Sequence, residues 1–260
     1  MSDHTVETEG AAIHYARAGH GPALLLIPGG GGDGARYAGV AAALSNRFTV
    51  LSMDRRCCGQ STGDRRQPFD AAQQARDAAA VIAAEGGAAH VFGNSGGGVV
   101  ALQLAADFPG HVTALVVHEP PVLSVLDDAA HWLAETDRIE ATYRTEGAMP
   151  AMMRFIGQIA GLGGPLPGPR PDPKDIDFFL DKELHHICRA VPDLGALKAV
   201  PVALAGGKAS GDAYYVRSAR AIAGRLGAPY VEFEGHHFAH AADPGRYAED
   251  IVAAFARLGA

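Results

Sequence analysis

The chain has 260 residues, 48% of them hydrophobic, and its 22 basic and 29 acidic residues give a formal net charge of 22 − 29 = −7. This length accommodates one large α/β domain or two small ones, and an acidic chain without a basic stripe argues against nucleic acid or an anionic membrane as a partner. No apolar run approaches the ~18 residues that span a bilayer, and the polar, acidic N-terminus is unlike a secretory signal.

The three cysteines are Cys57, Cys58 and Cys188. Their number is odd, two are adjacent, and their spacing does not match a metal site. This usage favours reduced thiols, so we expect a soluble cytoplasmic protein.

Predicted strands and helices alternate along most of the chain. Residues 4–19 predict an antiparallel hairpin that turns near Gly10. Apolar runs then predict strands at 23–27, 48–54, 89–92, 112–117, 200–207 and 228–235. The stretches with helical spacing lie at 37–45, 71–87, 97–106, 212–226 and 245–258. Because these strands are continuously apolar, we expect an α/β fold whose mostly parallel eight-stranded sheet has helices on both faces.

Residues 121–198 interrupt this alternation. They are predicted to be helical, are rich in Met, Phe and Leu, and contain the segment "GLGGPLPGPRPDP". Proline and glycine at that density break helices, so this segment is predicted to be a loop. We therefore expect a core domain formed by 1–120 and 199–260, with 121–198 inserted as a helical cap.

The sequence "GNSGG", residues 93–97, fits the pattern G-x-S-x-G between a predicted strand and a predicted helix. In that context the glycines permit a sharp turn that holds Ser95 with its hydroxyl exposed above the sheet. A glycine-rich turn with an idle serine is the alternative. A serine nucleophile also needs a base and an acid that orients the base.

Three histidines follow the last predicted strand: His236, His237 and His240. A histidine in this loop could reach back to Ser95, and we favour His237 as the base. His236 directly follows a glycine and is expected to face solvent, whereas His240 is expected at the surface or at the rim of the pocket.

The chain order serine, acid, histidine is that of α/β-hydrolases, most of which place the acid after the penultimate strand. Here that position carries Lys208, Ala209 and Ser210. Asp212 comes later and is expected to cap the following helix. Glu119 ends the strand after the nucleophile helix, where a buried carboxylate is costly unless its charge is needed. We therefore predict Glu119 as the acid, with an ion-paired rim residue as the alternative.

The loop "IPGGGGDG", residues 27–34, follows a predicted central strand. Attack on a carbonyl creates an oxyanion that fixed backbone N–H groups must meet. We expect Gly96, the residue after the nucleophile, to supply one N–H and Gly30 to supply the other.

The same loop permits a second interpretation. Gly29, Gly31 and Gly34 spell G-x-G-x-x-G after a strand, and Asp54 ends the next strand, which is the pattern of a dinucleotide-binding site. A hairpin precedes this unit, however, and an NAD-dependent oxidoreductase would leave the Ser95 motif unexplained.

Taken together, the glycine loop, "MDRRCCGQS", "GNSGG" and "GHHF" resemble the α/β-hydrolase fold superfamily over nearly the whole chain. Within it, "HEPP" around Glu119 is similar to the zearalenone lactone hydrolases. That resemblance implies a triad of Ser95, Glu119 and His237, an oxyanion hole at Gly30 and Gly96, and neither metal nor cofactor. "MDRRCCGQS" departs from the usual D-x-R-G-x-G-x-S at Cys57 and Cys58, which we expect to be small buried side chains rather than reactive thiols.

The predicted pocket draws mainly on the cap. We expect its substrate-binding residues to be Gly31, Trp132, Met153, Phe155 and Phe238. Packing within the helical core is the alternative for each apolar one. His185 and His186 lack a matching carboxylate spacing, so we expect solvated or capping roles and no metal site.

These residues predict a cofactor-free serine hydrolase acting on a small hydrophobic ester or lactone. Carbon–carbon bond hydrolysis, or perhydrolase or haloperoxidase chemistry, remains an alternative on the same triad. A non-catalytic ligand-binding receptor is a further alternative. The sequence leaves the oligomeric state open, a homodimer included.

Overall fold

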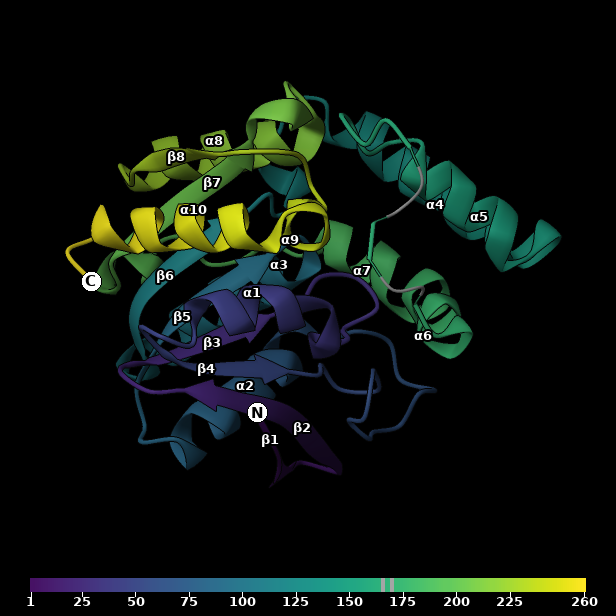
Figure 1. The fold of residues 1–260 in the computed structure, drawn as a ribbon. Coiled ribbons are helices and arrows are strands. Elements are labelled where there is room, and N and C mark those ends of the chain that lie inside the picture. The colour runs from purple at the N-terminus through teal and green to yellow at the C-terminus, as the bar shows by residue number, and fades with distance from the viewer. Residues whose placement is uncertain (165–166, 169–170) are drawn as a thin grey trace.

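The computed structural model describes residues 1–164, 167–168 and 171–260. At its centre lies an eight-stranded sheet with the spatial order β1-β2-β4-β3-β5-β6-β7-β8 (Figure 1). The strands are β1 (Ser2–Thr8), β2 (Ala11–Gly19), β3 (Ala23–Ile27), β4 (Thr49–Met53), β5 (Ala89–Asn94), β6 (Val112–His118), β7 (Val202–Gly207) and β8 (Tyr230–Phe233). β2 pairs antiparallel with β1 and β4, and all other pairs are parallel. The predicted fold class is confirmed.

Helices cover both faces of this sheet. They are α1 (Ala38–Leu44), α2 (Ala71–Ala84), α3 (Gly96–Asp107), α8 (Tyr214–Leu226), α9 (Ala239–Ala242) and α10 (Pro244–Ala256). Along β3, Leu24 and Leu26 pack with α1 and α10, whereas Leu25 and Ile27 pack with α2 and α3. Side chains alternate between the two faces of a strand, so a strand covered on both faces must be apolar at every position.

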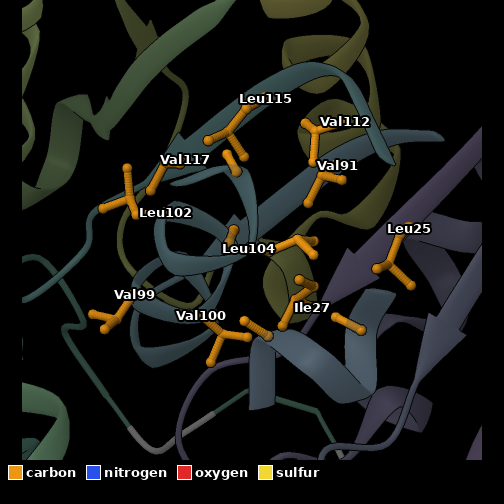
Figure 2. Packing of buried hydrophobic residues seen from close by; sticks show 14 of the residues in the cluster. Leu25, Ile27, Val91, Val99, Val100, Leu102, Leu104, Val112, Leu115 and Val117 are labelled. Carbon is orange, nitrogen blue, oxygen red and sulfur yellow. The ribbon is translucent and has the colours of Figure 1, made fainter. Parts of the chain in front are cut away.

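The core beneath α3 is densely apolar. Figure 2 shows side chains of α3, among them Val99 and Leu104, gathered with Val91, Leu115 and Ile27 of the strands. Each such side chain is almost fully buried and contributes about 1.5–3 kcal/mol to folding. This packing fixes α3, and therefore the turn that precedes it, against the sheet.

Residues 121–198, here called the helical insertion, separate β6 from β7. Its helices are α4 (Ala129–Glu146), α5 (Ala148–Ile156), α6 (Pro173–Phe178) and α7 (Leu184–Arg189). Short turns η3 (Leu123–Val125) and η5 (Ala196–Ala199) flank them, and a π-helical turn, η4 (Phe179–Glu183), joins α6 to α7. Figure 1 shows α4 to α7 grouped at one side of the sheet. Its status as a separate cap domain stays a prediction, and residues 165–166 and 169–170 of the expected loop lie outside the described residues.

Most predicted elements agree with the structure to within a few residues, but the expected helix cap is wrong. α8 begins at Tyr214, and no side chain caps its N-terminus. Asp212 instead lies at the surface, where it accepts a hydrogen bond from Arg220 at 3.2 Å. No described helix is long and apolar enough to cross a membrane.

The turn between β5 and α3 is tight. Ser95 has φ 55° and ψ −126°, a conformation that strains any residue with a Cβ. A Cβ at Gly97 would overlap the carbonyl oxygens of Ile27 and Pro28, because α3 starts directly against the end of β3. Only glycine fits at position 97, as the G-x-S-x-G pattern predicts.

Gly97→Ala is therefore expected to lower the free energy of unfolding by about 1–3 kcal/mol or more, because backbone rather than a movable side chain blocks the new methyl group. Gly110→Ala is the matched control, since a Cβ there meets no atom within 4 Å. The control should stay within about 0.5 kcal/mol of wild type in urea denaturation. Equal effects of the two substitutions would contradict this description of the turn.

Candidate active site

The candidate site lies where several parallel strands end. Ser95 follows β5, and its backbone N–H donates to the carbonyl oxygen of His118 at the end of β6. The backbone N–H groups of Gly98 and Val99 donate to the Ser95 carbonyl at 2.9 and 3.3 Å. Ser95 is thus held on both sides by backbone, while its side chain lines a cavity.

Glu119 is the first residue after β6, and it is fully buried. Like Ser95 it has a positive φ, 50°, and its backbone N–H donates to the carbonyl of Ala205 at 3.0 Å. One carboxylate oxygen accepts from the Gly207 N–H at 2.7 Å, and the other lies 2.7 Å from Nδ1 of His237. Both carboxylate oxygens are therefore hydrogen-bonded, which allows a charge to remain in the interior.

His237 is 4% exposed and lies between β8 and α9. It lines the same cavity as Ser95, and no direct hydrogen bond joins the two side chains in this structure. Contacts between nucleophile and base often tighten only when substrate binds. The structure thus brings Ser95 and His237 to one cavity and Glu119 into contact with His237, while their catalytic roles stay a prediction.

Burial and neighbouring groups set the pKa values of Glu119 and His118. Burial alone would raise the pKa of Glu119, but His118, the hydrogen bond to His237 and the Gly207 N–H together lower it to about 2. Complete burial lowers the pKa of His118 to about 4, so its ring is neutral near pH 7. Glu119 is therefore the negative charge that faces His237.

The usual acid position after β7 offers no alternative carboxylate. Lys208 forms an exposed ion pair with Glu234, and the backbone N–H of Gly207 supports Glu119. The side chain of Asp212 is 78% exposed and pairs with Arg220. The carboxylate that contacts His237 therefore follows β6 and not β7.

Gly30 and Gly96 both border the hollow beside Ser95. A Cβ at Gly30 would overlap the ring of Phe179, and one at Gly96 would lie 2.7 Å from Cδ1 of Ile187. The first N–H groups of a helix have no intrahelical partner, which leaves the Gly96 N–H available. The Gly30 N–H has no acceptor among the described residues. Both positions fit the predicted oxyanion role.

The dinucleotide interpretation of the glycine loop does not fit. Asp54 is 3% exposed, and its two oxygens accept from the N–H groups of Gly34 and Gln60 at 2.7 and 2.9 Å. His14 also contacts Asp54, at 2.9 Å. Both oxygens of Asp54 are therefore occupied by hydrogen bonds within the protein, and Asp54 is not free to bind a ribose.

The cavity beside Ser95 has a volume of about 60 Å³ and a mostly apolar lining. Of the five residues predicted to bind substrate, Gly31, Phe155 and Phe238 line it. Trp132 and Met153 are not among the described residues that do. Trp132 packs on Tyr214, with ring centroids 4.4 Å apart, and Met153 is 62% exposed. The expectation for these two residues is corrected: Trp132 packs behind Tyr214, which lines the smaller hollow beside Ser95, and Met153 is exposed to solvent.

His240 was expected at the surface or at the rim of the pocket, and the structure places it at the pocket and not at the surface. It is 4% exposed, stacks on Tyr37 with ring centroids 4.7 Å apart, and lines the cavity. Its position after His237, at the start of the short helix α9, carries it inward.

Comparison with known proteins agrees with this geometry. A family model described as alpha/beta hydrolase fold matches residues 22–157. The uncharacterized hydrolase YraK of Bacillus subtilis is 31% identical over 249 residues, which cover 91% of this chain and 90% of that protein. The chain belongs to the α/β-hydrolase fold family.

Other relatives of this α/β-hydrolase match less closely or over a shorter length. The putative carbamate hydrolase RutD of Caulobacter vibrioides is 35% identical over 136 residues, 48% of this chain and 50% of that protein. An α/β-hydrolase of Sphaerobacter thermophilus superposes with a TM-score of 0.72 and 27% identity over 97% of this chain and all of the other. A thermophilic esterase of Thermogutta terrifontis has a TM-score of 0.79 with 17% identity over the full length of both chains, which shows the shared fold.

The hydrolase departs from the family pattern at Cys57, which has φ 68°. Glycine adopts this conformation without strain, which explains why the pattern has glycine there. Cys57 and Cys58 are buried, and burial raises the pKa of both thiols. The expectation of small buried side chains is confirmed.

A buried ion pair stabilises the glycine loop. It was not predicted from the sequence. Arg55 and Glu183 are both fully buried, and Nη1 and Nη2 of Arg55 lie 2.5 and 3.0 Å from the two carboxylate oxygens of Glu183. Arg55 also donates to the carbonyls of Pro28 and Gly29 at 2.9 and 2.7 Å, and the Gly31 N–H donates to Glu183 at 3.1 Å. The helical insertion is thereby tied to the loop that carries Gly30.

His185 lies closer to carboxylates than its sequence context suggested. Its Nδ1 is 3.2 Å from Glu140 and 3.5 Å from Asp137, close enough for the three to hold a metal ion. Arg189, however, donates to Asp137 at 2.8 Å and lies 3.0 Å from the same nitrogen of His185. A guanidinium in that place already balances the carboxylates, so we interpret the group as a surface ion-pair cluster.

Glu183→Gln is expected to destabilise the hydrolase by about 3–5 kcal/mol, because the Arg55 charge then stays buried without a counter-charge. Glu234→Gln breaks an exposed ion pair and should cost no more than about 1 kcal/mol. Chemical denaturation of both variants checks this difference. A loss at Glu183 as small as that at Glu234 would show that the buried pair does not hold the loop.

The neutral, buried His118 predicts a stability that depends on pH. Between pH 6.5 and 4 the unfolded chain binds a proton at His118 that the folded chain does not, so stability should fall as the pH falls. The loss from pH 7 to 4.5 should be about 2 kcal/mol larger in wild type than in His118→Gln, as followed by urea denaturation. Glu119 contributes only below about pH 4.5, because its folded pKa is depressed. An unchanged pH dependence in the variant would contradict this assignment.

Proposed function

We propose that this α/β-hydrolase cleaves a carboxylic ester, a small hydrophobic ester or lactone, through an acyl-enzyme on Ser95. The observation that carries the proposal is the 2.7 Å contact between Nδ1 of His237 and the charged carboxylate of Glu119. That contact fixes the tautomer of the ring and leaves Nε2 to accept a proton.

The reaction has two acyl-transfer steps. Ser95 Oγ attacks the ester carbonyl while His237 removes its proton, and the N–H groups of Gly30 and Gly96 bind the oxyanion. The C–O bond of the ester breaks, and the alcohol leaves with the proton from His237. Water, activated by the same ring, then releases the acid; a lactone yields one opened molecule. Glu119 stabilises the imidazolium in both steps.

The lining of the cavity supports an apolar substrate. Phe155, Phe179 and Phe238 lie around Ser95 together with Met152 and Ile176. A cavity of this kind takes up the hydrocarbon part of an ester, while the oxyanion donors orient its carbonyl. The proposed chemistry needs no cofactor, because serine, histidine and backbone N–H groups supply each role.

Glu119→Gln is expected to lower kcat for a p-nitrophenyl ester by roughly 10³–10⁴-fold, because a neutral amide neither fixes the tautomer nor stabilises the imidazolium. Asp212→Asn is the matched control and should retain activity within about twofold. A fluorophosphonate should label Ser95 in wild type, as located by peptide mass spectrometry.

Two results would overturn the proposal. Folded wild-type protein that is not labelled at Ser95 would exclude a serine nucleophile. A large loss of activity in Asp212→Asn with little loss in Glu119→Gln would assign the acid to position 212.

A further inference from the structure

The cavity beside Ser95 is lined by a positively charged side chain that the proposed ester chemistry does not use. Arg36 lies in η1 (Gly34–Tyr37), directly after the glycine loop, and lines the cavity together with Ser95 and His237. Its side chain has no hydrogen-bond or ion-pair partner among the described residues. Burial lowers the pKa of Arg36, and the nearby charge of Asp33 offsets only part of that effect.

A second polar group in the same cavity also lacks a partner. His240 is 4% exposed, and its Nδ1 has no hydrogen-bond partner in the described part of the chain. Burial, and then the nearby charge of Arg36, hold the pKa of His240 well below its ordinary value. A neutral imidazole carries one N–H, so His240 can donate a hydrogen bond beside the Arg36 guanidinium.

Neither acidic side chain near Arg36 neutralises it. Asp33 caps η1 by accepting from the Ala35 N–H at 2.8 Å. Asp175, which also lines the cavity, accepts from the Gly59 N–H at 3.2 Å and lies 3.5 Å from Arg65. Besides the Arg36 guanidinium, three buried polar atoms on residues lining this cavity lack a hydrogen-bond partner among the described residues: Nδ1 of His240, the hydroxyl of Tyr37 and Oδ1 of Asp175. Asp175 Oδ1 has Arg65 as its counter-charge at 3.5 Å, so Arg36 and the two donors His240 and Tyr37 are left without a partner, which is costly for buried groups.

We propose that Arg36 and His240 bind a carboxylate of the substrate, so that the hydrolase acts on esters or lactones that bear a carboxylate group. This inference rests on the proposed ester chemistry and narrows its substrate class. A guanidinium presents a planar pair of N–H donors that matches the two oxygens of a carboxylate. Because Ser95 lines the same small cavity, the carboxylate and the scissile ester belong to one compact molecule.

The test compares matched probes in wild type, Arg36→Met and Arg36→Lys. p-Nitrophenyl hydrogen glutarate and p-nitrophenyl valerate place a carboxylate or a methyl group on the acyl side. 4-Carboxyphenyl acetate and 4-methylphenyl acetate do the same on the alcohol side. In at least one pair, Arg36→Met should lower kcat/KM for the anionic ester at least tenfold more than for the neutral ester, and Arg36→Lys should restore part of that difference.

Binding provides a readout that does not depend on turnover. Glutarate should slow fluorophosphonate labelling of Ser95 in wild type but not in Arg36→Met. Arg220→Met, which removes an equal charge from the surface, should behave as wild type in both assays. Equal losses for anionic and neutral esters in both pairs, or glutarate protection that survives in Arg36→Met, would overturn the carboxylate site.

The two proposals fail in different ways. Hydrolysis of the neutral esters with Ser95 labelled, but without a selective effect of Arg36, would refute only the carboxylate site. A wild-type protein that hydrolyses no ester and resists the phosphonate would refute the ester chemistry itself.

Discussion

The candidate site depends on one buried negative charge. Glu119 stands where the backbone of β6 ends, with no exposure to solvent, and it is stable there because the Gly207 N–H and His237 take one oxygen each. Removal of either partner would leave a charge uncompensated in the interior. Glu119 also has a positive φ of 50°, a conformation that costs energy in a residue with a Cβ.

The rest of the site is assembled from segments far apart in the chain. The glycine loop supplies one face, and Arg55 anchors it to Glu183 of the helical insertion. Phe179 and Ile187 of the insertion cover the two glycines predicted to bind the oxyanion. A movement of the helical insertion would therefore displace the glycine loop, because the two segments share a buried ion pair and direct packing.

Local patterns made much of this structure predictable. The strands, the turn at Ser95 and the helices follow from apolar runs and glycine spacing. Glu119 is predicted as the acid because Lys208 stands where the acid usually lies. Contacts between residues far apart in the chain could not be predicted from local patterns. Nothing in the sequence relates Arg55 to Glu183, 128 residues away. Trp132 and Met153 were misplaced because composition does not reveal which face of an insertion helix meets the cavity. The choice between surface and pocket for His240 stayed open, because its burial depends on the packing of α9.

The most direct test of the account is proton NMR of the histidine–glutamate contact. The Nδ1 proton of His237, bonded to a charged carboxylate and shielded from solvent, should give a slowly exchanging resonance far downfield of the backbone amides. The account predicts that this resonance is lost in His237→Gln and in Glu119→Gln but retained in Asp212→Asn. Its absence from folded wild type, or its persistence in Glu119→Gln, would contradict the account.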